Sequence, residues 1–118
     1  AVACAYCDKA GIDEKTMFQL TEGFGLGMGG MKGTCGAVSG AVVLAGMKNS
    51  TGNTEHPDSK GATYKLSREI VKEFQEKNSS VVCEELKGVE TGNVLRSCGG
   101  CIKDAVLLAG KILYGEEE

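Results

Sequence analysis

Cysteines are the residues of this chain best suited to chemistry, and their spacing divides them into pairs and single residues. Cys4 with Cys7 and Cys98 with Cys101 each form a C-x-x-C pair, whereas Cys35 stands alone, as does Cys83. A cysteine thiolate attacks disulfides or binds soft metal ions, and both activities need sulfur atoms held close together. Six cysteines allow many pairings, so spacing alone does not choose among them.

Cys35 has the most informative surroundings. A glycine-rich stretch, residues 25–33, leads into Thr34, Cys35 and an apolar run over residues 41–47. Thr34 is a good N-cap, so we expect Cys35 in the first turn of a helix, near unpaired N–H groups and the positive end of the helix dipole. That position favours the thiolate, and small neighbouring residues leave the sulfur approachable. Cys35 is therefore the candidate attacking thiol.

Helices are expected to position these cysteines, because no segment reads convincingly as a strand. Five helical segments are expected: residues 1–10, a segment capped by Asp13, and residues 34–48, 62–77 and 94–113. Residues 81–86 add one or two helical turns. The prediction is an all-α fold, a single compact domain over residues 1–118 with about five helices and a Gly-rich loop before the central helix.

Periodicity in two segments predicts which side chains face the core. Met17, Leu20 and Phe24 recur at helical spacing, as do Leu66, Ile70 and Phe74. Two features concern helix surfaces. Glu73 and Lys77 have the favourable i,i+4 orientation for an ion pair, and the Gly36-x-x-x-Gly40 spacing lets a neighbouring backbone approach the central helix.

Composition limits the classes of function. The net charge is −3 and no basic cluster is present, which argues against a nucleic-acid partner. The longest apolar run, residues 41–47, is too short to insert across a membrane. No signal peptide is visible, so we expect a reducing cytoplasm. The chain lacks an initiator Met, and we expect the natural protein to begin upstream of Ala1.

The last helical segment offers two interpretations of its cysteines. Cys98 and Cys101 fall on one apolar stripe and could simply be small buried hydrophobic residues. Gly99 and Gly100 separate them, however, and two glycines inside a helix cost about 2 kcal/mol relative to alanine. Such a cost suggests that another part of the chain approaches the helix closely at these glycines, or that a local break in the helix places Cys101 at a helix start.

Other motifs give weaker signals. Cys4 and Cys7 share one helical face, and two C-x-x-C pairs could build a four-thiolate zinc or iron–sulfur site, although the intervals match no zinc knuckle. A thioredoxin-type site needs a βαβ pattern that is not visible here. The Gly25-x-Gly27-x-x-Gly30 run follows no strand and reads as a turn, and His56 lies in a polar loop where we expect it to be solvated.

The ordered motifs along the chain resemble a known family. Cys35-Gly-Ala-Val-Ser-Gly40 has the form Cys-Gly-Ala-x-x-Gly, and Gly11-Ile-Asp-Glu14, residues 23–29, Cys83-x-x-Leu86 and Cys98 follow the family order. The chain resembles the C_GCAxxG_C_C family over essentially its whole length. The resemblance implies a small helical protein of the bacterial or archaeal cytoplasm, with a redox role that rests on four shared cysteines.

Three of those four cysteines carry over, namely Cys35, Cys83 and Cys98. The fourth would lie just before Ala1, and neither Cys4 nor Cys7 matches it. Cys101 is additional to the family pattern.

Three functions remain open from the sequence. The first is thiol–disulfide exchange, as by an oxidoreductase, or redox sensing, with Cys35 as attacking thiol and Cys98 or Cys83 as its resolving partner. The second is a zinc or iron–sulfur module ligated by Cys35, Cys83, Cys98 and Cys101. The third is a structural domain with packed cysteines. The expected partners are a redox protein and a second copy of the chain, because small helical domains with glycine-rich faces often pair.

Overall fold

The computed structural model describes residues 1–116, and within them the chain is helical with no strand. The helices are α1 (Val2–Ala5), α2 (Cys7–Ala10), α3 (Glu14–Thr21), the 3-10 helix η1 (Glu22–Phe24), α4 (Gly25–Met28), α5 (Gly36–Asn49), α6 (Lys60–Asn78), α7 (Cys83–Lys87) and α8 (Cys98–Tyr114). The all-α prediction is confirmed, but the expected five segments are divided into more and shorter helices.

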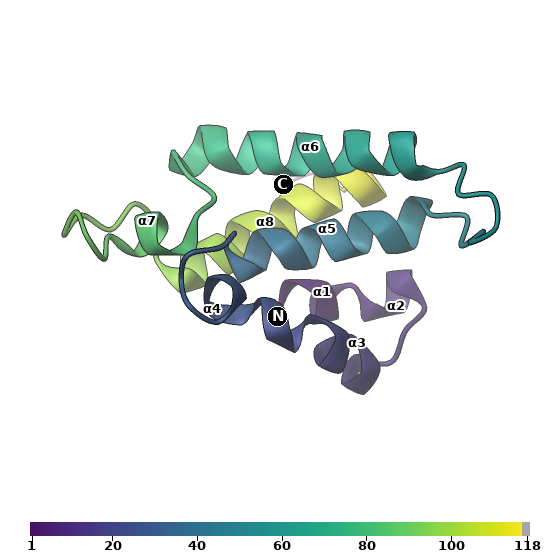
Figure 1. Cartoon of the computed structure of the whole chain (residues 1–118), viewed down its shortest axis with the longest axis horizontal. Coiled ribbons are helices and arrows are strands. Elements are labelled where there is room, and N and C mark those ends of the chain that lie inside the picture. The colour runs from purple at the N-terminus through teal and green to yellow at the C-terminus, as the bar shows by residue number, and fades with distance from the viewer. Residues whose placement is uncertain (117–118) are drawn as a thin grey trace.

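Three long helices, α5, α6 and α8, pack together and form the centre of the molecule. Figure 1 shows α1, α2 and α3 along the side of α5 that faces away from α6, while α4 and α7 gather at one end. The core is continuous across these layers. Its largest fully buried side chains include Met17 from α3, Leu44 from α5, Ile70 and Phe74 from α6, and Leu113 from α8.

The central position of α5 follows from its small residues. A Cβ added at Gly40 would lie 3.4 Å from the backbone nitrogen of Ala3, so α1 crosses α5 at this glycine. At the start of the helix, a Cβ on Gly36 would come within 3.0 Å of the carbonyl oxygen of Phe24. The expectation that this glycine spacing admits a neighbouring backbone is therefore confirmed.

Helix boundaries differ from the expectation at the N-terminal end. The first segment is broken at Tyr6, where the backbone leaves the helical region. The Tyr6 side chain is buried, and its hydroxyl donates to the carbonyl oxygen of Val106 in α8 at 2.9 Å. Asp13 caps α3 as predicted, accepting from the Thr16 N–H at 3.0 Å. Leu20 lies within α3 but is exposed, so of this helix only Met17 is a buried core residue.

The glycine-rich stretch is the loop that was expected, although it contains η1 and the single turn α4. Leu26 and Gly27 have positive φ inside α4, so this segment is a tight left-handed turn rather than a regular helix. It brings Gly27 against Cys83, as described below. The interpretation of these glycines as turn residues is confirmed.

Two other expectations are wrong. Glu73 and Lys77 do not pair with each other, because Lys77 lies 3.1 Å from Asp104 and Glu73 accepts from Lys111 at 2.9 Å. The last helix begins at Cys98 rather than near Val94, which is exposed in the preceding loop.

Within residues 1–116, no helix combines the length and the apolar character needed to cross a membrane.

The C-terminal tail, residues 115–118, is acidic. Glu117 and Glu118 lie outside the described residues. Glu116 is anchored, because its N–H donates to the carbonyl oxygen of Gly110 at 2.8 Å and its carboxylate accepts from the Tyr6 hydroxyl at 3.3 Å.

Candidate functional site

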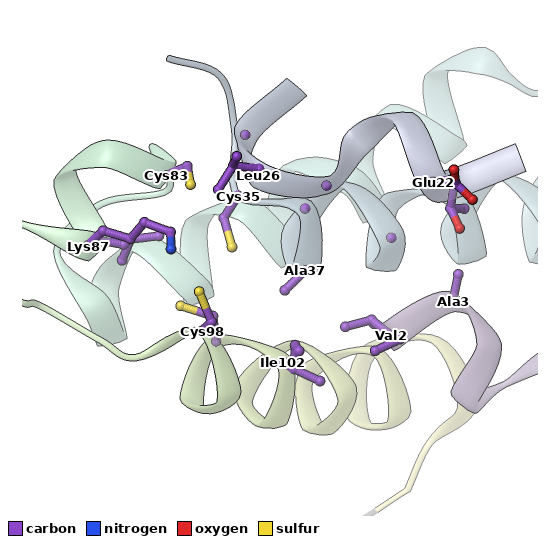
Figure 2. A pocket seen from close by; sticks show the side chains of 18 of the residues that line it. Val2, Ala3, Glu22, Leu26, Cys35, Ala37, Cys83, Lys87, Cys98 and Ile102 are labelled. Carbon is purple, nitrogen blue, oxygen red and sulfur yellow. The ribbon is translucent and has the colours of Figure 1, made fainter. Parts of the chain in front are cut away.

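The candidate site is a cavity of about 330 Å³ at the end of the molecule where α5 and α8 begin. Four cysteines from separate stretches of sequence line it: Cys35, Cys83, Cys98 and Cys101. All are free thiols. Figure 2 shows the sulfur atoms of Cys35, Cys83 and Cys98 directed into the same space. We call this cavity the thiol pocket.

Cys35 stands at the N-cap position of α5, one residue earlier in the helix than the sequence suggested. Thr34 does not cap the helix. It lies in a short antiparallel bridge with Val82, and the Cys35 N–H donates to the carbonyl oxygen of Val81 at 2.6 Å. This bridge joins the glycine-rich loop to the segment before α7, and it leaves the Cys35 side chain half-buried beside the pocket.

Cys83 is held on the neighbouring segment of the same bridge. Its N–H donates to the carbonyl oxygen of Gly33 at 3.0 Å, and its Cβ lies only 2.4 Å from where a Cβ on Gly27 would be. Any side chain at Gly27 would displace Cys83. Burial and the nearby Cys35 raise the pKa of the Cys83 thiol, and the positive charge of Lys87 opposes that rise.

The other two pocket cysteines come from the first turns of α8. Ser97 caps this helix by accepting from the Gly100 N–H at 3.0 Å, so Cys98 is the first helical residue. Cys98 is exposed, which contradicts the interpretation that both cysteines face the core, whereas Cys101 is 3% exposed.

Cys101 is the cysteine most closely associated with Cys35. Burial, the proximity of Cys35 and a hydrogen bond between the two side chains raise the pKa of Cys101 to about 12. The Cys101 thiol is therefore kept protonated beside the Cys35 sulfur.

A buried charge cluster fixes the start of α8. Asp104 is 2% exposed and accepts two hydrogen bonds from the Arg96 guanidinium, Nε at 3.0 Å and Nη2 at 3.2 Å. Lys77 and Asn78 of α6 contact the same carboxylate at 3.1 and 3.2 Å. Burial raises the pKa of Asp104, but hydrogen bonds from Arg96, Lys77 and Asn78 outweigh it and hold the pKa below its usual value.

This cluster explains one of the two glycines between Cys98 and Cys101. A Cβ on Gly100 would lie 2.5 Å from Cζ and Nε of Arg96, so the arginine can cross α8 to reach Asp104 only over a glycine. Gly99 has open space around it. The cluster was not anticipated from the sequence, although a lone acid at Asp104 within an apolar stripe was a signal that could have revealed it.

The remaining cysteines form a separate pair outside the residues that line the thiol pocket. Cys4 and Cys7 lie on either side of the break at Tyr6, and both are half-buried. Partial burial, the proximity of Cys4, a hydrogen bond with Cys4 and the charge of Glu14 raise the pKa of Cys7. The two C-x-x-C pairs therefore do not share one site.

Residues 1–116 contain no group of three or more His, Cys, Asp or Glu side chains arranged to hold a metal ion. His56 is exposed in the loop between α5 and α6, as expected.

Comparison with known proteins agrees with the arrangement of the cysteines. The model of the family described as "Putative redox-active protein (C_GCAxxG_C_C)" matches residues 1–112. Neither a curated protein nor a solved structure matches the chain significantly. With nearly its whole length covered by the family model, the chain belongs to this C_GCAxxG_C_C family.

Proposed function

We propose that this protein carries out thiol–disulfide exchange at the thiol pocket, with Cys35 as the attacking thiol. The observation that carries the proposal is the convergence of four free thiols on one cavity, among them Cys35 and Cys101. Thiols brought together by distant segments of a fold are available for intramolecular disulfide formation, which requires Cβ atoms roughly 3.5–4.5 Å apart.

Cys35 suits the attacking role for two reasons. Its side chain borders the pocket and is only half-buried, so a substrate disulfide can reach it. Its sulfur is also directed into the space that the other pocket cysteines line.

Cys101 suits the resolving role better than Cys98 or Cys83, the partners favoured from the sequence. The Cys35 thiolate attacks one sulfur of a substrate R–S–S–R′, forms a mixed disulfide and releases R′S⁻. Cys101 then loses its proton to R′S⁻ and attacks the Cys35 sulfur. A Cys35–Cys101 disulfide forms and RS⁻ leaves, so the protein, which starts as the Cys35 thiolate, loses two electrons and one proton as the substrate is reduced to the thiol R′SH and the thiolate RS⁻.

The raised pKa of Cys101 is suited to this order of events. Two of its causes, the proximity of Cys35 and the hydrogen bond with it, depend on Cys35 being a free thiol or thiolate. A mixed disulfide at Cys35 removes both of these causes, while burial, the largest cause, remains. The pKa of Cys101 then falls at the step in which Cys101 must act as a nucleophile.

The test is exchange with hydroxyethyl disulfide, followed by quenching with acid and mass analysis. We expect Cys35→Ser to form no intramolecular disulfide at Cys101, and Cys101→Ser to accumulate the mixed disulfide at Cys35. Cys4→Ser is the matched control, because it removes a half-buried thiol outside the pocket, and it should keep the parental rate. Full retention of exchange in Cys35→Ser would contradict the proposal.

The proposal includes a reducing compartment, the cytoplasm, and a redox partner that returns the disulfide to two thiols. Metal analysis of the same anaerobic sample separates it from the alternative of a zinc or iron–sulfur module. Stoichiometric metal together with masked thiols would favour that alternative and would contradict exchange as the main activity.

A further inference from the structure

The thiol pocket has the size and lining of a small-molecule site. Its volume of about 330 Å³ is close to the lower limit of roughly 300–1,000 Å³ that is typical of ligand pockets. Apart from the thiols, most of its wall is apolar. Figure 2 shows Val2, Ala37 and Ile102 along the cavity, with Leu26 near its thiol end.

Charged side chains lie at both ends of this cavity. Glu22 is at the end opposite the cysteines in Figure 2, while Lys87 extends its amino group toward the space among the sulfur atoms. Arg96 also lines the cavity, but its charge is offset by the two hydrogen bonds to Asp104.

Lys87 is the cation left without an acidic partner at the thiol end. Among residues 1–116 no ion pair is formed by Lys87, and its charge is felt by the Cys83 thiol. An anionic group on a bound molecule would be repelled by Glu22 and attracted by Lys87. The charges therefore orient such a molecule with its anionic end toward the cysteines.

We propose that the thiol pocket takes a small, mainly apolar organic disulfide that carries an anionic group, which Lys87 binds next to the thiols. This inference deepens the proposed function and rests on it. Lys87 also lies where charge develops, because attack by Cys35 releases a thiolate. The same amino group then favours binding of the anion and departure of the leaving group.

The test compares three small disulfides whose charges differ. 5,5′-Dithiobis(2-nitrobenzoate) is aromatic and anionic, 4,4′-dithiodipyridine is aromatic and neutral, and cystamine is cationic. Rates are measured by stopped flow on the reduced full chain carrying Cys4→Ser and Cys7→Ser, so that the observed reaction comes from the pocket thiols. The ratio of the anionic to the neutral rate is the readout, since a change in thiolate content affects both rates alike.

Lys87→Gln should lower that ratio about fivefold to tenfold, the effect of removing one partly solvated charge near an anion. Lys48→Gln makes the same change of net charge at the far end of α5 and should leave the ratio unchanged within about twofold. An unchanged ratio in Lys87→Gln, or an equal fall in both variants, would overturn the assignment of Lys87.

A second variant tests the apolar wall without altering charge. Ile102 is 37% exposed, so Ile102→Ser should fold normally. We expect it to slow both aromatic disulfides and to leave cystamine unaffected, and equal slowing of all three would overturn the apolar class. Failure of the proposed function gives a different pattern, because Cys35→Ser would then leave all three rates unchanged.

Discussion

The two C-x-x-C pairs of this chain share a spacing but differ in surroundings. Cys98 and Cys101 open a long helix capped by Ser97 and face Cys35 and Cys83 across a cavity. Cys4 and Cys7 straddle the break at Tyr6, outside the residues that line that cavity.

The charges around the two pairs also differ. Beside the α8 pair, burial raises the pKa of Cys83 and Lys87 opposes that rise, whereas burial, Cys4 and the charges of Glu14 and Asp13 all raise the pKa of Cys7. Spacing places two sulfurs near each other, but the segments packed against them decide which pair faces other thiols and a cation.

The largest expected effect is the contrast in reactivity within the α8 pair. With a pKa of about 12 against the ordinary 9.0, the thiolate of Cys101 is about a thousandfold rarer at pH 8 than that of an unperturbed thiol. Within the pair, iodoacetamide should therefore label the exposed Cys98 before Cys101, as measured by mass analysis of quenched samples. Labelling of Cys101 before Cys98 would break the contrast.

The same pKa gives a pH dependence of stability. The pKa of the Cys101 thiol is higher in the folded than in the unfolded protein, so this thiol adds to the free energy of unfolding at any pH below its unfolded value. That contribution is lost as the pH rises from about 9 toward 12. Urea unfolding at several pH values should show the loss, and Cys101→Ala should reduce the slope of the free energy of unfolding against pH. An equal slope in Cys101→Ala would show that this thiol is not the cause.

The next effect concerns the buried charge cluster that fixes the α8 pair and has no counterpart at Cys4 and Cys7. Asp104→Ala should lower the free energy of unfolding by about 2–4 kcal/mol, below the upper range for a buried pair because Arg96 and Lys77 can reach solvent. Urea unfolding at pH 7 measures the loss. A loss under about 1 kcal/mol would show that the cluster behaves as a surface ion pair.

Two adjacent glycines provide a matched pair of variants in the same turn. Gly100→Ala should destabilise the protein by about 1–2 kcal/mol, since the new Cβ displaces the Arg96 guanidinium. Gly99→Ala meets open space and should be neutral or stabilising by roughly 0.5 kcal/mol, because alanine favours the helix. Thermal unfolding distinguishes them, and equal effects would contradict the role given to Gly100.

The smallest effect is expected at the other pair. Glu14 raises the pKa of Cys7, so Glu14→Gln should increase the alkylation rate of Cys7 at pH 8 by less than about twofold, as for an exposed charge. Glu55→Gln in the distant loop is the control and should change nothing. A large increase would show that electrostatics, rather than exclusion from the pocket, separates the two pairs.

Much of the fold could be predicted from local patterns. Hydrophobic spacing placed α6 with Ile70 and Phe74 in the core, and Asp13 was identified as the cap of α3. These features depend on neighbours within one helix, so a single sequence carries them.

The errors arose where distant segments decide the structure. Val94 and Leu95 continue the apolar stripe of α8, yet the helix begins only at Cys98, because the N–H groups of Leu95 and Arg96 donate to the carbonyl oxygen of Leu86 in α7 instead. Lys77 pairs with Asp104 rather than with Glu73, because a buried carboxylate attracts it across the helix interface. Likewise, the reason for Gly100 is visible only once Arg96 crosses the helix above it.

The most direct test of the central claim is to map the first disulfide that forms in the reduced full chain. The protein is titrated with one equivalent of oxidised dithiothreitol, remaining thiols are blocked with N-ethylmaleimide, and linked peptides are identified by mass analysis. We predict a Cys35–Cys101 disulfide, with Cys4 and Cys7 both blocked as free thiols. A Cys4–Cys7 disulfide with Cys35 still free would contradict the account and move the redox centre to the other pair.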